Sequence, residues 1–297
     1  MRDDDLPEFL AGLGLPGLFD VHVHFMAPNI QKRVWDYFDS AGPLLGKAWP
    51  INYRFSDEER VARLRAMGVK HFSALSYAHR EGIAQHLNDW TMAFAKNVPE
   101  ALASGTFYPE RNAGEYVAQL IEDGAEIFKA HMQVGEFAAD DVQLDPVWAE
   151  LERTNTPVVL HAGSGPAPGE FTGPASVQRV LERYPELNLI IAHLGMPEFS
   201  QFFDLAQRFE NVFLDTTMVF VDFWDGDDHG LSISDPRTEL DRIAELGDKI
   251  LFGTDFPQIP YEYAHQVEVL AKLDLGEDWL RNVLWQNGAT LFGKDGG

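Results

Sequence analysis

The sequence predicts a (β/α)₈ barrel, a closed ring of parallel strands in which each strand is followed by a helix. Eight short apolar runs recur along the chain, and helical patterns lie between them, as such a barrel requires. The turn after the first run reads His22-Val23-His24-Phe25, whereas the rival doubly wound sheet usually carries a glycine-rich phosphate turn there. Since 297 residues fit one α/β barrel, we expect a single domain over residues 1–297.

The predicted strands are short runs that are apolar on both faces, which is typical of buried parallel strands. They cover residues 18–23, 69–75, 103–107, 125–128, 157–160, 187–192, 212–214 and 249–252.

The predicted helices show apolar residues at helical spacing, and Ser56 provides an N-cap for one of them. They cover residues 57–67, 83–96, 113–122, 145–153, 175–183 and 236–246.

Two connections, residues 25–55 and 215–235, are too long for ordinary loops between a strand and a helix. Both leave the C-terminal ends of strands, where barrel active sites lie, so we expect them to be lids over the site. Their rings predict an aromatic wall for a substrate, although the same rings can serve only to hold the lids down. These rings are Phe25, Trp35, Tyr37, Phe38, Trp49, Tyr53, Phe220, Phe223 and Trp224.

The composition excludes several classes of partner. A formal charge of -24 repels phosphate backbones and anionic lipid surfaces, so we expect neither nucleic acid nor membrane as a partner. The chain has no cysteine, so nitrogen and oxygen must hold any metal. No secretory leader or membrane-spanning run is present, and we therefore expect a cytoplasmic protein with a small-molecule substrate.

His22 and His24 stand two apart where the first strand ends, so alternation along the strand places both on one side. Two neutral imidazoles there can chelate one cation. His161, His193 and Asp255 each follow another apolar run, and the C-terminal ends of barrel strands meet at one rim. The sequence therefore predicts a metal site at that rim.

These segments resemble the amidohydrolase superfamily, specifically the amidohydrolase family 2 branch that includes aminocarboxymuconate semialdehyde decarboxylase. The matching pieces are Phe19-Asp20-Val21-His22-Val23-His24, Val158-Val159-Leu160-His161, Ile191-Ala192-His193-Leu194-Gly195, Phe252-Gly253-Thr254-Asp255-Phe256-Pro257 and Asn287-Gly288-Ala289. The resemblance spans the predicted barrel from its first strand to its closing helix.

The resemblance implies one divalent ion held by His22, His24, His161 and Asp255, with His193 beside its water. Zinc is the favoured ion, and manganese, iron or cobalt are alternatives. His193 and Asp255 are the expected catalytic groups for proton transfer, since imidazole titrates near neutral pH. The resemblance also implies a homodimer.

Lys129 ends the fourth predicted strand and leaves three alternatives open. It could be a carboxylated lysine that bridges two metals, as in binuclear members of the superfamily, an anchor for a substrate carboxylate, or an ion-pair partner at the rim. Alternation places His131 on the same face, so we expect Lys129 and His131 to bind substrate together.

Hydrolysis of an amide, ester or lactone by metal-activated water is the leading expectation for the reaction, on a small substrate that carries a carboxylate or an aromatic ring. The alternative is non-oxidative decarboxylation of an aromatic or muconate-like acid. A third possibility from another class is a catalytically silent barrel that only binds a metal or a ligand.

Overall fold

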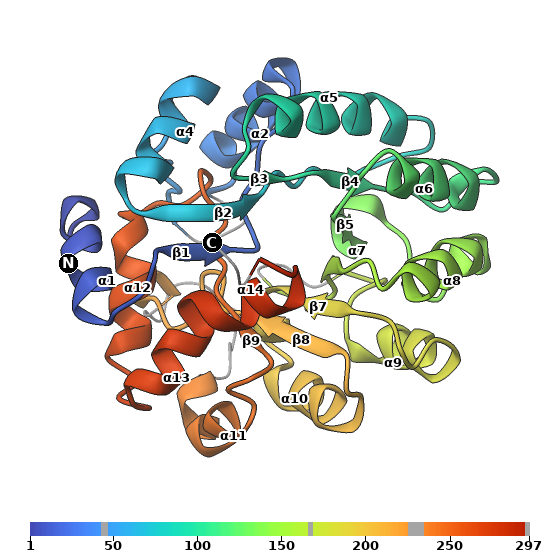
Figure 1. Cartoon of the computed structure of the whole chain (residues 1–297). Coiled ribbons are helices and arrows are strands. Elements are labelled where there is room, and N and C mark those ends of the chain that lie inside the picture. Colours follow the sequence, from blue (N-terminus) through green and yellow to red (C-terminus); the bar gives the residue numbers. More distant parts are fainter. Residues whose placement is uncertain (43–46, 166–168, 225–234, 295–297) are drawn as a thin grey trace. The chain divides into compact units, whose positions relative to one another are not determined.

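The computed structural model describes residues 1–42, 47–165, 169–224 and 235–294 (Figure 1). Its backbone contacts divide the chain into two compact units. Unit 1 comprises Met1–His24, Pro28–Phe72 and Asp215–Gly297, and unit 2 comprises Phe25–Ala27 and Ser73–Leu214. Each unit is built from parallel strands and helices, as the sequence predicts. The expectation of a single domain stays a prediction.

The strands of unit 2 follow one another in space as they do along the chain. Strands β4 to β8 pair in sequence order, each parallel to the next. The pairing places His131 at the end of one strand directly beside His161 at the end of its neighbour. The strands are β3 (Ala101–Leu102), β4 (Ser104–Thr106), β5 (Ile127–His131), β6 (Val158–His161), β7 (Leu189–Ile191) and β8 (Val212–Asp215), whose last residue belongs to unit 1.

Helices alternate with these strands and cover one side of them (Figure 1). Each helix buries an apolar stripe; in α8, for example, Val147, Trp148 and Leu151 are fully buried. The helices are α5 (Ala84–Asn97), α6 (Ala113–Glu122), α7 (Met132–Gly135), η2 (Val142–Leu144), α8 (Asp145–Thr154), α9 (Pro174–Arg183), η3 (Ala192–Gly195) and α10 (Phe199–Arg208).

Unit 1 contains the first two strands and the last strand. Strand β1 (Leu18–Asp20) pairs in parallel with β2 (Val69–Ser73), whose last residue belongs to unit 2, and β9 is Ile250–Leu251. The helices are η1 (Asp3–Asp5), α1 (Leu6–Gly12), α2 (Pro28–Ser40), α4 (Asp57–Ala66), η4 (Asp222–Trp224), η6 (Pro236–Glu239), α11 (Leu240–Glu245), α12 (Tyr263–Ala271), α13 (Glu277–Arg281), η7 (Asn282–Gln286) and α14 (Asn287–Leu291).

The predicted cap of α4 is confirmed. The Ser56 hydroxyl accepts the backbone N–H of Glu59, and the Glu59 carboxylate accepts the backbone N–H of Ser56. Both N–H groups lie at the start of the helix, where no helical carbonyl can pair with them.

The segment after β1 differs from the predicted loop, because residues 28–40 form α2. The length of the connection indicated a loop, whereas the helical spacing of Ile30, Val34, Trp35 and Phe38 indicates this helix. In the second predicted lid, residues 225–234 lie outside the described residues. The lid function of both segments stays a prediction.

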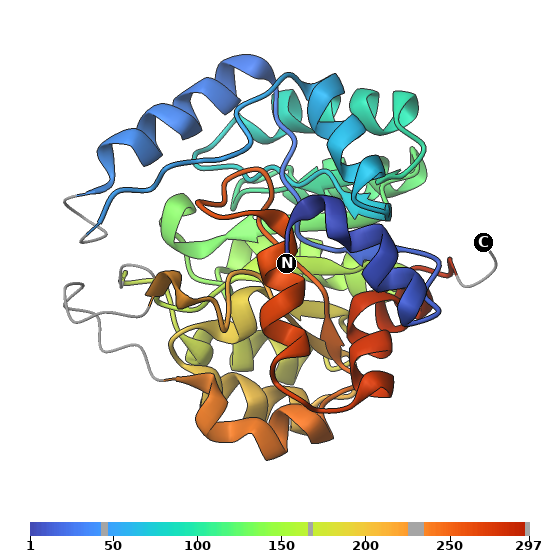
Figure 2. The ribbon, with the colours of Figure 1, turned by 90° about the vertical axis from the view of Figure 1, so that its left-hand side faces the viewer.

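The N-terminal turn of unit 1 lies beside the start of α12 (Figure 2). Asp3 accepts the backbone N–H of Ala264 at 2.9 Å and the hydroxyl of Tyr53. It therefore satisfies one of the free N–H groups in the first turn of α12. In the described part of the chain, no helix is long and apolar enough to cross a membrane.

Candidate metal centre

His22, His24 and Asp255 form a cluster in unit 1 whose ligand atoms lie within 4.8 Å of one another. The Nε2 atom of His24 lies 2.8 Å from Oδ1 of Asp255, and the Nε2 atom of His22 lies 3.7 Å from the same oxygen. The two imidazoles are buried, at 1% and 4% exposure. Two nitrogens and one carboxylate oxygen thus face one point, which suits a borderline divalent cation.

Backbone hydrogen bonds hold the two segments of this cluster against each other. The chain stays extended beyond β1: Val21 N–H donates to the carbonyl of Phe252, and His24 N–H to that of Phe256. Asp255 N–H donates to the carbonyl of His22 at 2.8 Å. Asp255 itself has φ of 71°, a left-handed conformation that costs energy in a residue with a side chain and is concentrated at functional sites.

Asp215 at the end of β8 orients His22, a role that was not predicted from the sequence. Its Oδ2 lies 2.8 Å from Nδ1 of His22, and both side chains are buried. An ionised carboxylate only accepts hydrogen bonds, so Nδ1 carries the proton and Nε2 presents a lone pair to the cluster. Asp215 directly follows the apolar run Val212–Leu214, as His161 directly follows its own apolar run. This position at the end of a strand is the sequence signal that could have identified Asp215.

Gly253 makes room for this pair. A Cβ atom on Gly253 would lie 2.3 Å from Oγ1 of Thr217, 2.9 Å from Cβ of His22 and 3.3 Å from Cβ of Asp215. Such contacts are shorter than van der Waals packing allows, so the close approach of these side chains requires glycine.

Asp20 has a structural place in unit 1. It accepts hydrogen bonds from the hydroxyls of Thr254 (2.6 Å) and Tyr263 (2.8 Å) and from the backbone N–H of His22 (3.1 Å). Burial dominates over these bonds and raises the pKa of the Asp20 carboxyl to about 7. Asp20 therefore fixes the backbone of His22, and Asp215 orients its imidazole.

His131, His161 and His193 lie together in unit 2. The rings of His131 and His161 stack with centroids 3.9 Å apart, and the ring of His193 lies 4.7 Å from that of His161. His193 has φ of 56° and sits in the turn that follows β7. Unit 2 thus brings the fourth predicted ligand beside the predicted proton-transfer group.

Hydrogen bonds define the protonation of two of these rings. Nε2 of His161 lies 2.9 Å from the carbonyl oxygen of Gly165, which only accepts, so this nitrogen is protonated and Nδ1 holds the lone pair. Nδ1 of His131 accepts the backbone N–H of Val134, so in the neutral ring Nε2 is the donor.

Lys129 lies on β5, two residues before His131, and is 1% exposed. The strand alternation that the sequence analysis used places both residues on one face. The roles of His161, His193, Lys129 and His131 stay predictions.

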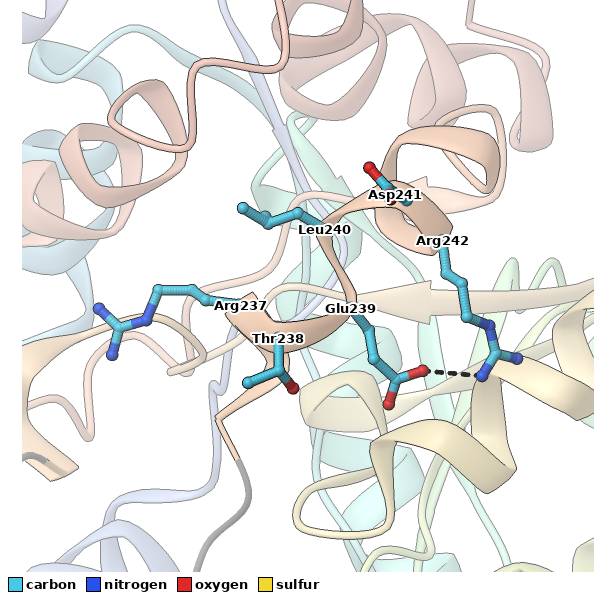
Figure 3. A pocket seen from close by; sticks show the side chains of 6 residues that line it. All are labelled: Arg237, Thr238, Glu239, Leu240, Asp241 and Arg242. Carbon is cyan, nitrogen blue, oxygen red and sulfur yellow. Dashed lines mark hydrogen bonds and ion pairs between the residues drawn. The ribbon is translucent and has the colours of Figure 1, made fainter.

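A surface hollow of about 310 Å³ lies elsewhere in unit 1 and is lined by the consecutive residues 237–242 (Figure 3). The carboxylate of Glu239 accepts from Arg242 at 2.8 Å, and Arg237 pairs with Asp235. In Figure 3 the side chains of Arg237 and Arg242 extend in different directions. These charges are already paired, so the hollow does not resemble a catalytic site.

A family model described as amidohydrolase matches residues 19–294, a range that includes His22, His24, His161, His193 and Asp255. The chain belongs to the amidohydrolase family. No curated protein matches the sequence.

Solved structures show the same fold. An uncharacterised TIM-barrel protein from Bordetella bronchiseptica is 21% identical, with a TM-score of 0.74 over 95% of this chain and 100% of that one. A 5-carboxyvanillate decarboxylase from Novosphingobium aromaticivorans, in complex with manganese and 4-hydroxy-3-methoxy-5-nitrobenzoic acid, is 15% identical, with a TM-score of 0.64 over 94% and 97%. A dihydroorotase from Campylobacter jejuni is 14% identical, with a TM-score of 0.58 over 93% and 83%.

The predicted (β/α)₈ barrel is therefore confirmed, and the chain is an enzyme of the amidohydrolase superfamily. The donor set of His22, His24 and Asp255 fits the divalent metal of this family, because Asp215 leaves a lone pair on the His22 nitrogen that faces the cluster.

Proposed function

We propose that this amidohydrolase is a metal-dependent hydrolase that uses activated water on an amide, ester or lactone of a small aromatic or carboxylate-bearing substrate. The observation that carries the proposal is the pairing of Asp215 with His22 inside the cluster of His22, His24 and Asp255. A carboxylate that hydrogen-bonds to a ligand imidazole fixes the tautomer of the ring and raises its basicity. A histidine with only a structural role does not require such a partner beside two further potential ligands.

The ion would be held by His22, His24 and Asp255 of unit 1, with His161 as the fourth ligand. When bound, a divalent cation polarises a substrate oxygen and lowers the pKa of coordinated water from 15.7 toward about 7. Zinc is the ion that we propose, because nitrogen and carboxylate ligands suit it.

His193 is the proposed proton carrier. Imidazole can both take and return a proton near neutral pH, which hydrolysis requires as water adds and the leaving group departs. Asp255, whose carboxylate already lies 2.8 Å from His24, is the second proposed proton acceptor. Lys129 and the Nε2–H of His131 are the proposed groups that bind a substrate carboxylate.

Decarboxylation of an aromatic acid is the second candidate. The observation that favours it is the likeness to 5-carboxyvanillate decarboxylase, whose structure holds an aromatic acid and manganese. The same residues would serve that reaction, since a proton must reach the ring carbon that carbon dioxide leaves.

Parallel assays on the metal-loaded chain separate the two reactions. One set follows hydrolysis of lactones, esters and amides that carry an aromatic ring or a carboxylate, and the other follows carbon dioxide release from hydroxybenzoates. We expect turnover in the first set, loss of that turnover on chelation and recovery when the metal is returned.

Carbon dioxide release without hydrolysis would replace the first proposal by the second. Hydrolysis that continues unchanged in the chelated chain would contradict both. A chain that binds the metal and turns over neither set would favour the silent barrel.

A further inference from the structure

Gln258 lies three residues beyond Asp255 and carries a buried amide nitrogen with no hydrogen-bond acceptor in the part of the chain that the structure describes. The residue is 3% exposed. A buried donor without an acceptor destabilises the fold, and such groups are rare in folded proteins. The amide therefore requires an explanation.

The orientation of this amide is fixed by a tryptophan. The indole N–H of Trp35 on α2 donates to Oε1 of Gln258 at 3.0 Å. An indole nitrogen can only donate, so the amide cannot be flipped without placing two donors face to face. The NH₂ group consequently points away from Trp35.

The backbone of Gln258 is tied to the metal loop. Its N–H donates to the carbonyl of Asp255 at 2.8 Å, and its carbonyl accepts the indole N–H of Trp49 at 2.6 Å. One turn thus carries both the proposed ligand Asp255 and the unpaired donor of Gln258. The two tryptophans that bond to Gln258 belong to the predicted aromatic wall.

A second buried glutamine provides a comparison. Gln31 on α2 is 2% exposed, and its Oε1 accepts from Arg60 at 3.0 Å while its Nε2 has no acceptor among the described residues. Gln31 is bonded to Arg60 of α4, whereas Gln258 lies on the turn of Asp255. Only the position of Gln258 connects its free donor to the metal loop.

We propose that the amide of Gln258 is the hydrogen-bond donor that selects the substrate, by binding an oxygen of an aromatic acid beside the metal. The inference rests on the proposed function and adds a residue and a substrate class to it. The NH₂ group gains its missing acceptor when the acid binds, and Trp35 acts as a positioning residue that holds the amide in the donating orientation.

The test measures the affinity of the metal-loaded chain for 4-hydroxy-3-methoxy-5-nitrobenzoate by titration calorimetry. Gln258→Met removes the donor with little change in size, and Gln258→Glu removes the donor while keeping an oxygen for Trp35. We expect both variants to bind the acid about tenfold or more weakly than the parent chain. Gln31→Met is the matched control and should stay within about twofold of the parent.

Metal content and thermal unfolding are measured on the same samples. Equal affinity of the parent and both Gln258 variants would overturn the inference, as would an equal loss in Gln31→Met, or a metal-loaded parent that binds no acid. In each of these cases an intact metal content and hydrolysis leave the proposed function standing. A parent chain that takes up no metal would instead overturn the proposed function, and the inference with it.

Discussion

At the scale of single residues, the centre of the account is the proton on His22. Asp215 accepts from Nδ1, so Nε2 is the nitrogen of His22 that faces Asp255. The two imidazoles and the carboxylate reach one point because the extended chain after β1 and the turn at Asp255 are joined by backbone hydrogen bonds. A ligand with a fixed tautomer needs no rearrangement when an ion arrives.

Asp215→Asn tests this orientation. The change keeps the size of the side chain and removes the charge that makes His22 basic, so we expect metal affinity to fall about 10- to 100-fold in calorimetric titration. Asp222→Asn is the control, because Asp222 also pairs with a histidine, His265 at 2.9 Å, that is not one of the three residues of the cluster. An unchanged affinity in Asp215→Asn would refute the orienting role.

His193→Asn tests the proton carrier. Asparagine tolerates the left-handed backbone of this position, where φ is 56°, so the turn should be retained. We expect kcat to fall by about 10²- to 10⁴-fold while metal content stays at the parent value. Unchanged turnover would remove His193 from the mechanism.

The sequence shows which residues end strands, and that was enough to find His22, His24 and Asp255. It does not show which side chains contact each other, so the pairing of Asp215 with His22 was not predicted. The proposed role of Gln258 could not be predicted from the sequence, because it depends on a buried amide donor without an acceptor among the described residues and not on the residue type.

At the scale of elements, the predicted strands and helices correspond to observed elements, because the apolar residues of each sequence pattern are the residues that the fold buries. Helix α6 was predicted over its observed residues, 113–122. The third predicted strand, residues 103–107, corresponds to β4, whereas β3 lies before it and was not predicted. Helix α2 was missed because the length of the connection was taken as a sign of a loop.

Asp20 connects β1 to α12, and its removal should weaken unit 1. Asp20→Ala leaves the hydroxyls of Thr254 and Tyr263 and the N–H of His22 without their acceptor. We expect a loss of at least about 2 kcal/mol in the free energy of unfolding, measured with denaturant on the metal-free chain. Asp39→Ala, which removes an exposed partner of Arg54, should cost much less, because an ion pair at the surface contributes little to stability. Similar small losses in both variants would contradict the structural role of Asp20.

A pH effect is expected where α9 meets the segment before η2. The hydrogen bond from Arg179 holds the pKa of Asp140 below its ordinary value, so the folded chain binds fewer protons at this site than the unfolded chain. The pair therefore stabilises the fold at neutral pH, and its contribution disappears as pH falls through the folded-state pKa of Asp140.

Asp140→Asn should lower the free energy of unfolding at pH 7 by less than about 1 kcal/mol, because the pair is partly exposed. The difference from the parent chain should shrink below about pH 4, where unpaired aspartates protonate. Denaturant titrations at several pH values measure this difference. A difference that stays constant with pH would show that the ion pair is not its cause.

At the scale of the whole molecule, family membership and fold agree with the sequence. The amidohydrolase model covers residues 19–294, and the TIM-barrel fold is shared with the Bordetella bronchiseptica protein. A formal charge of -24 disfavours polyanionic partners, and the homodimer and the cytoplasmic location stay predictions. The reaction could not be read from the sequence, because the same metal ligands and proton carrier are proposed for hydrolysis and for decarboxylation.

The most direct test of the central claim is the metal content of the purified chain, measured by elemental analysis beside Asp255→Asn, a variant that keeps the left-handed backbone and loses a ligand charge. We predict about one divalent ion per parent chain and much less in the variant. Two ions per chain would favour a bridge at Lys129. A parent chain that holds no ion after exposure to zinc or manganese would contradict the account.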